Sequence, residues 1–162
     1  MTGQERKRRR VLSRTRIHER VRELGRQITA DYRDGQLVLL GVLNGAFVFC
    51  ADLCREIDLD VEIDFIRVAS YGAATESSGT ISLLREPSLD LVGKDLLLVE
   101  DIVDSGLTLR YLRTNLQVRQ PVTLEVCTLL VREHSDQPDP VLRYECFRIP
   151  SHFVIGSDLA HL

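Results

Sequence analysis

Three carboxylates crowd into five residues of this 162-residue sequence, at Glu100, Asp101 and Asp104. They directly follow an apolar run, DLLLV at 95–99, which predicts a buried strand. Negative charges this close together repel one another, so a bound cation or a hydroxyl-bearing ligand would stabilise them. Neighbouring carboxylates suit the two adjacent hydroxyls of a ribose, or a hydrated Mg²⁺ ion that a sugar diphosphate carries.

The residues after these acids favour an anion instead. They lie at the start of a predicted helix, where they offer backbone N–H groups and two hydroxyls. These residues are Ser105, Gly106, Leu107 and Thr108. Unpaired N–H groups and the helix dipole attract phosphate, and Gly106 lets the backbone come close to it. Simple helix capping by Asp104 or Ser105 explains one residue, but not three carboxylates. The loop is therefore predicted to hold a sugar through its acids and the sugar's phosphate through its amides.

Apolar periodicity predicts alternating strands and helices around this loop. Helices are expected at 14–33, 46–57 and 107–118, and strands at 36–43, 61–68, 81–84, 95–99, 122–131 and 153–155. Small polar residues at 69–80 predict a flexible loop. No repeat or linker interrupts the chain, so the alternation predicts one α/β domain over 1–162 with a mostly parallel sheet. Ligands of such sheets bind beyond the carboxyl ends of the strands, where the segments 43–45 and 100–108 fall.

Composition and charge limit the expected partners. The net charge of −3, with 44% hydrophobic and 28% charged residues, is typical of a globular protein and indicates neither a nucleic acid nor an anionic membrane. The basic run at 6–10 has no interleaved aromatic residues, so a flexible solvated arm over 1–13 is preferred to a nucleic-acid contact. No apolar stretch of about 18 residues predicts a membrane span, and no apolar core of a secretory signal is present. The four cysteines, at 50, 54, 127 and 146, lack metal-site spacing and predict core residues in a reducing compartment, which favours the cytoplasm.

Four segments carry a resemblance to a known family. VEDIVDSGLT at 99–108 resembles the motif with which type I phosphoribosyltransferases bind 5-phosphoribosyl 1-pyrophosphate (PRPP). LLGVLNGAFVFCADL at 39–53, DFIRVASYG at 64–72 and FRIPSHFVIG at 147–156 resemble the pyrophosphate loop, the start of the catalytic flap and the purine-binding strand of hypoxanthine(-guanine) phosphoribosyltransferases. The resemblance implies the type I phosphoribosyltransferase fold, with a flap and a small hood. It also implies purine salvage, in which the 5-phosphoribosyl group passes from PRPP to N9 of hypoxanthine and/or guanine and gives IMP or GMP and pyrophosphate.

The resemblance assigns roles within the acidic loop. Glu100 and Asp101 would hold the ribose hydroxyls, directly or through Mg²⁺. Asp104 would take a proton from purine N7, or hydrogen-bond to it, as N9 attacks ribose C1′. The 5′-phosphate would lie among Ser105, Gly106, Leu107 and Thr108.

The other three segments would complete the site. Leu43, Asn44 and Gly45 would bind pyrophosphate through backbone amides, in a loop that often carries a strained or cis peptide in the family. Ser70 and Tyr71 would close over the reaction and exclude water. The purine contacts would be Arg132 at O6, Phe153 stacked on the base and Val154 paired with the base edge through its backbone. Periodicity alone predicts that Phe153 is a core aromatic, and only the resemblance favours stacking.

The sequence departs from the family pattern in places. Asn44 and His152 stand where many relatives have Lys, and Arg132, which is longer and planar, replaces the usual Lys at the purine. Past the purine strand, relatives read GYGLDY and continue into a tail that supplies a metal-binding Asp and a pyrophosphate-contacting Arg. The chain reads GSDLAHL at 156–162, so either Asp158 serves as the metal ligand through a local rearrangement or the second metal site is lost.

Two classes of function follow. One is the purine salvage enzyme with Mg²⁺, and the other is a non-catalytic or weakly active regulatory protein that binds PRPP or a nucleotide on the same fold. Asp104, Ser70 and Tyr71 favour the enzyme, whereas the shortened C-terminus and the basic arm favour the regulator. Hypoxanthine and guanine share O6, so these residues do not choose between them. Family members are dimers or tetramers, which implies a homo-oligomer.

Overall fold

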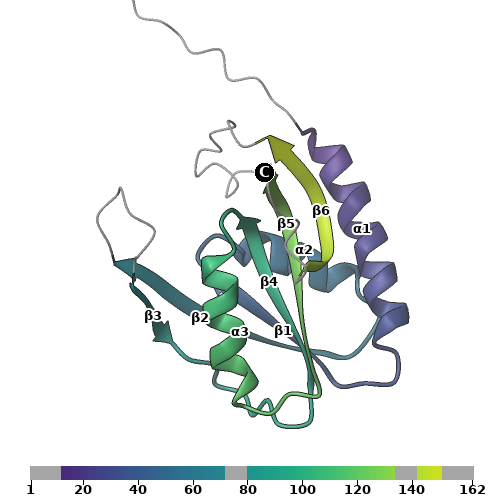
Figure 1. Ribbon diagram of the computed structural model, residues 1–162. Coiled ribbons are helices and arrows are strands. Elements are labelled where there is room, and N and C mark those ends of the chain that lie inside the picture. The colour runs from purple at the N-terminus through teal and green to yellow at the C-terminus, as the bar shows by residue number, and fades with distance from the viewer. Residues whose placement is uncertain (1–11, 72–79, 134–141, 151–162) are drawn as a thin grey trace, which may run out of the picture.

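The computed structural model describes residues 12–71, 80–133 and 142–150, and its centre is a six-stranded sheet (Figure 1). The elements are α1 (Arg14–Asp31), β1 (Leu37–Leu43), α2 (Phe47–Glu56), β2 (Val61–Tyr71), β3 (Thr80–Arg85), β4 (Asp95–Val103), α3 (Leu107–Gln117), β5 (Thr123–Glu133) and β6 (Leu142–Pro150). The strand order is β3-β2-β1-β4-β5-β6, and every pair is parallel except β2 with β3. The predicted α/β class with a mostly parallel sheet is confirmed.

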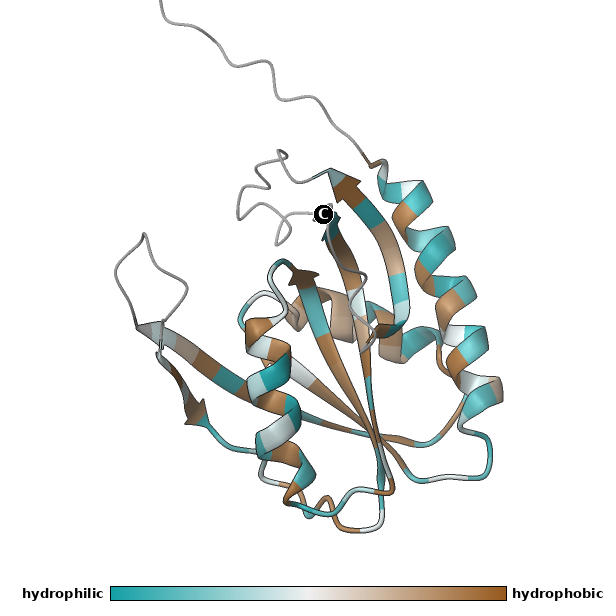
Figure 2. Cartoon of the chain, in the orientation of Figure 1, coloured by the Kyte–Doolittle hydropathy of each residue, from teal (hydrophilic) through white to brown (hydrophobic). Residues whose placement is uncertain are grey.

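The sheet is buried on both faces, because its central strands are apolar at successive positions. In β1, Leu37 and Leu39 belong to the core cluster beneath α1 and α2, whereas Val38 and Leu40 belong to the cluster beneath α3. Figure 2 shows the result as strands that are brown along most of their length, between helices striped brown and teal. Unbroken apolar runs of this kind are typical of parallel strands covered by helices on both sides.

Helix α1 begins where a side chain can satisfy its first N–H groups. The Ser13 hydroxyl accepts a hydrogen bond from the Arg16 backbone N–H at 3.2 Å, and Val21, Leu24 and Ile28 form the buried stripe. Of the predicted basic arm, residues 1–11 lie outside the described residues, and Ser13 is part of the helix cap instead. No helix within the described ranges is long and apolar enough to cross a membrane.

Strand β4 is longer than the sequence predicted, and this extension carries the acidic pair. The apolar run ends at Val99, but Glu100 and Val103 still pair with Thr128 and Val131 of β5. Pairing with β1 stops at Val99, so only one neighbour accompanies β4 over its last residues. The prediction that 100–103 form a loop was wrong, because the longer β5 supplies backbone partners to polar residues as readily as to apolar ones.

Strand β2 also continues past its predicted end. Ser70 and Tyr71, which were predicted in a loop over 69–80, pair in antiparallel fashion with Ile81 and Thr80 of β3. The buried side chain of Asp64 holds the segment that follows β3. Its carboxylate accepts hydrogen bonds from the backbone N–H of Ser88 at 2.6 Å and of Leu89 at 2.9 Å. Burial alone would raise the pKa of Asp64, but these donors and others lower it overall. Residues 72–79 lie outside the described part of the chain.

Periodicity did not predict strand β6, because charged residues interrupt its apolar pattern. Its last residues, 147–150, fall within the segment that resembles the purine-binding strand of the family. It forms the edge of the sheet beside β5, with Tyr144 and Cys146 buried. Arg20 of α1 donates hydrogen bonds to the backbone carbonyls of Glu145 at 2.7 Å and Cys146 at 3.3 Å. These two hydrogen bonds join α1 to β6, which is an edge strand of the sheet within the described residues. The strand predicted at 153–155 lies outside the described residues.

Candidate active site

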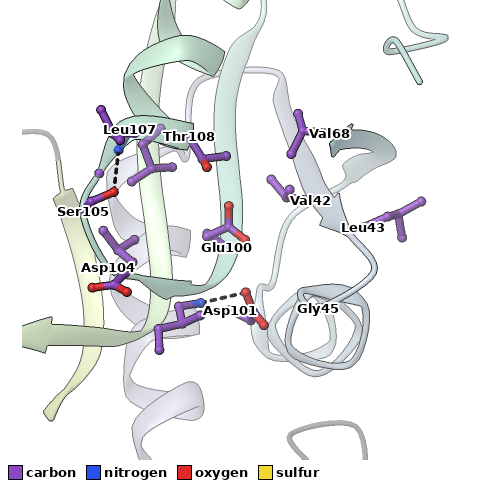
Figure 3. A pocket seen from close by; sticks show the side chains of 14 residues that line it. Val42, Leu43, Gly45, Val68, Glu100, Asp101, Asp104, Ser105, Leu107 and Thr108 are labelled. Carbon is purple, nitrogen blue, oxygen red and sulfur yellow. Dashed lines mark hydrogen bonds between the residues drawn. The ribbon is translucent and has the colours of Figure 1, made fainter. Parts of the chain in front are cut away.

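The two predicted loops meet at the carboxyl edge of the sheet. Because β1 and β4 are parallel neighbours, the β1–α2 and β4–α3 connections emerge side by side. They line a cavity of about 290 Å³. Its walls are residues 100–109, together with Val42 and Leu43 of β1, Gly45, and Val68 of β2 (Figure 3).

Gly45 lies directly against Asp101, so the β1–α2 connection contacts the end of β4. A Cβ atom at position 45 would overlap the Asp101 carboxylate. That carboxylate also accepts a hydrogen bond from the N–H of Ile102 at 2.8 Å, which fixes its orientation (Figure 3). One residue earlier in the same loop, the Leu43–Asn44 peptide is cis. Only glycine fits at position 45 while Asp101 keeps its place.

Glu100 is the most buried acid of the site, with 8% of its surface exposed. Burial raises the pKa of Glu100 well above its ordinary value, and the negative charge of neighbouring Asp101 raises it further. A positive charge in the cavity would oppose both effects, because it would favour the ionised form of the carboxyl.

The raised pKa of Glu100 predicts how the stability of the unliganded protein depends on pH. The folded chain holds this proton more tightly than the unfolded chain, so stability is lost as pH rises from about 4.5 toward the folded-state pKa. We expect Glu100→Gln to remove this loss and to raise the Tm near pH 7.5 by roughly 2–4 °C for each kcal/mol regained. Thermal unfolding of both proteins without ligand, from pH 5 to 8, measures the difference.

The control for this prediction is Glu19→Gln, at an exposed position of α1. It removes one carboxylate and leaves the buried one in place. If the wild type and both variants showed parallel curves of Tm against pH, burial of Glu100 would not be the cause.

Asp104 and Arg132 lie side by side, because β4 and β5 end next to one another. A guanidinium nitrogen of Arg132, Nη1, is 3.5 Å from Oδ2 of Asp104. Half of the Asp104 side chain is exposed, whereas Arg132 Nε is buried and has no hydrogen-bond partner within the described residues. The pair presents a hydrogen-bond acceptor and a donor together at the edge of the sheet.

The turn after Asp104 leads into α3 through a glycine, which has no side chain to cap the helix. Gly106 is the N-cap and has a positive φ of 74°, a conformation that favours glycine. The Leu107 N–H donates to the Ser105 hydroxyl over a long 3.5 Å, and the first turn of α3 contains no acidic residue. Neither Asp104 nor Ser105 is the N-cap, so simple capping does not explain this segment. The helix N-terminus is instead suited to an anion.

The remaining predicted residues are not all at the cavity. Ser70 is exposed at the end of β2, and Asn44 and Arg132 do not line the walls. Phe153, Val154 and Asp158 lie outside the described residues. Five apolar lining residues were not identified from the sequence: Val42, Val68, Ile102, Val103 and Leu109. Only the position of each near a strand end, or in the first turn of α3, distinguishes it from an ordinary core residue.

A parallel sheet that places paired acids and an uncapped helix N-terminus at one cavity defines an α/β protein that binds a sugar phosphate or nucleotide. Comparison with known families makes this class specific. The phosphoribosyl transferase domain family matches residues 10–162.

Individual relatives agree with this match. The hypoxanthine phosphoribosyltransferase of Salmonella typhimurium is 43% identical over 142 residues, which are 86% of this chain and 80% of the relative. The hypoxanthine-guanine phosphoribosyltransferase of Dictyostelium discoideum is 46% identical over 147 residues, covering 88% and 82% of the two chains. The crystal structure of a hypoxanthine phosphoribosyltransferase from Staphylococcus aureus superposes with a TM-score of 0.86 at 36% identity, over 94% of this chain and 83% of that one. The chain belongs to the hypoxanthine(-guanine) phosphoribosyltransferase family, as its motifs indicated.

Proposed function

We propose that the protein transfers the 5-phosphoribosyl group of PRPP to N9 of hypoxanthine and/or guanine, with release of pyrophosphate. The observation that carries this proposal is the placement of Glu100, Asp101 and Asp104 on one cavity with the uncapped N-terminus of α3. Acids for the ribose, amides for its phosphate and a carboxylate for the base are then within reach of one ligand. The names of the relatives support the same reaction.

Glu100 and Asp101 would hold the ribose hydroxyls and Mg²⁺. Both carboxylates line the cavity, and oxygen ligands of this kind suit Mg²⁺. The buried Glu100, whose pKa is raised, fits a site that a cation completes. Mg²⁺ commonly keeps several waters and takes its other ligands from substrate phosphates, so two protein carboxylates suffice. When bound, the ion would neutralise charge on the departing pyrophosphate.

Asp104 and Arg132 would read the edge of the base that carries N7 and O6. Arg132 would donate a hydrogen bond to O6, and Asp104 would accept the proton of N7 as N9 attacks C1′. Their separation of 3.5 Å supports contact with two neighbouring atoms of one purine. Phe153 would stack on the base, and Val154 would pair with its edge through the backbone.

The backbone of Leu43, Asn44 and Gly45 would bind the pyrophosphate, and its position beside Asp101 supports this role. Ser70 and Tyr71, at the end of β2, would lead a flap over the reacting atoms and exclude water, which otherwise hydrolyses PRPP. A second metal ion would be held by Asp158 through a local rearrangement of the chain.

The setting of the protein follows from the same proposal. Its four cysteines are free, and this supports a reducing compartment such as the cytoplasm. The family resemblance supports assembly into a dimer or tetramer in which each subunit is one domain over residues 1–162. Sedimentation velocity of the purified protein measures that assembly.

The direct test is to mix the protein with PRPP, Mg²⁺ and hypoxanthine and to follow IMP formation by absorbance. Guanine and xanthine are assayed in parallel, and adenine is the control. We expect turnover with hypoxanthine or guanine but not with adenine, because its 6-amino group would place donors against the donors of Arg132. Tight binding of PRPP or nucleotide without turnover would overturn the proposal in favour of a regulatory protein.

A further inference from the structure

Arg110, the fourth residue of α3, reaches back to the segment that precedes the helix. Its Nη2 donates a hydrogen bond to the backbone carbonyl of Ser105 at 3.2 Å. We propose that Arg110 is a positioning residue, which holds the Ser105–Gly106 peptide so that the Gly106 N–H points at the 5′-phosphate. This inference rests on the proposed function, since the phosphate is that of PRPP.

The geometry of the Ser105–Gly106 peptide supports this role for Arg110. The Ser105–Gly106 peptide is trans, so the carbonyl of Ser105 and the N–H of Gly106 point in opposite directions. Ser105 and Gly106 line the cavity, whereas Arg110 does not. A guanidinium that holds the carbonyl from outside therefore turns the N–H toward the cavity.

The Ser105 carbonyl precedes the N-cap, so it lies outside the hydrogen-bond pattern of α3 and needs a partner of another kind. The Gly106 carbonyl accepts the Arg110 backbone N–H at 3.0 Å, as in an α-helix, but no backbone N–H of the described chain donates to the Ser105 carbonyl. Among the described residues, the N–H groups of Gly106, Thr108 and Leu109 have no hydrogen-bond partner either. Arg110 supplies the hydrogen bond to the Ser105 carbonyl, and the three backbone N–H groups remain available to an anion.

The charge of Arg110 supports the same role. A cation near a helix N-terminus opposes the helix dipole, and the first turn of α3 has no acidic residue to offset it. A phosphate at the cavity would be attracted by both the dipole and the guanidinium. The arrangement is therefore unfavourable without a ligand and favourable with an anionic one.

The test compares Arg110→Gln with Arg113→Gln, which removes the same charge from α3 at a residue that makes no hydrogen bond to the loop. The dissociation constant of ribose 5-phosphate is measured by calorimetry without base or turnover, and kcat and KM by the IMP assay. We expect Arg110→Gln to weaken ribose 5-phosphate binding and raise the KM for PRPP by about tenfold each. The kcat and the KM for hypoxanthine should stay within about twofold of wild type.

A third variant, Arg110→Lys, keeps a donor for the carbonyl and is expected to recover most of the affinity. The inference is overturned if Arg110→Gln binds ribose 5-phosphate as wild type does. It is also overturned if Arg113→Gln is equally impaired, because charge alone would then explain the loss. A wild-type protein that binds ribose 5-phosphate but forms no IMP would contradict the proposed function, while the comparison of variants would still test Arg110.

Discussion

Replacing Asp104 with Asn is expected to lower kcat by about 10²–10⁴-fold while the affinity for nucleotide changes little. Asparagine has the shape of the carboxylate but does not accept the N7 proton. The side chain is half exposed at the end of β4, so the substitution leaves no buried cavity. Steady-state kinetics with hypoxanthine, together with titration of IMP, separate the two quantities.

Two controls make the Asp104→Asn result decisive. The Tm of the variant should match that of wild type, which shows that the fold is intact. Asp90→Asn, outside the site between β3 and β4, should leave kcat within about twofold of wild type. If Asp104→Asn weakened nucleotide binding as much as it lowered kcat, Asp104 would be a binding residue without a role in proton transfer.

Replacing Gly45 with Ala is expected to lower kcat/KM for PRPP by about 10²-fold, because small displacements of positioning groups have effects of this size. The added Cβ would overlap the Asp101 carboxylate, so either the pyrophosphate loop or the acid must move. Both outcomes disturb the end of the cavity where the ribose and pyrophosphate would bind. Kinetics at varied PRPP and at varied hypoxanthine concentration should show a larger change in the KM for PRPP than in the KM for hypoxanthine.

The matched control is Gly93→Asn, in a turn where a Cβ would meet no atom within 4 Å. Its φ of 72° is tolerated by asparagine better than by most residues. We expect this variant to keep near-normal kinetics. If Gly45→Ala retained wild-type kcat/KM for PRPP, the close approach of the two loops would have no role in binding.

The parallel core of the fold was predictable, because it depends on a local signal. The unbroken apolar runs of β1 and the first half of β4 appear in the sequence as strands buried on both faces. The second half of β4 and all of β6 depend instead on pairing with β5, the strand that lies beside both of them in the sheet. Polar residues there form strands because their backbone groups hydrogen-bond to the neighbouring strand. The apolar periodicity of a segment carries no information about that pairing.

The site was predictable to the same degree. Residue types and order identified the acids and the phosphate loop, and the rule that ligands bind at strand ends placed both loops at one edge. Two contacts required the structure: Asp104 with Arg132, and Gly45 with Asp101. Each joins residues far apart in the sequence, and only the strand order brings them together. The assignments of Phe153, Val154 and Asp158 stay predictions.

The strand order has a consequence for how the protein acquires activity. β1 lies between β2, which follows it in the chain after a single helix, and β4, which is made much later. The β1–α2–β2 unit can form from local contacts, whereas the pairing of β1 with β4 closes a long loop and is correspondingly slow. Gly45 therefore meets Asp101 only after most of the chain has left the ribosome. A shorter nascent chain has the pyrophosphate loop but lacks the acids that would hold ribose, so the site can assemble only after β4 has been made.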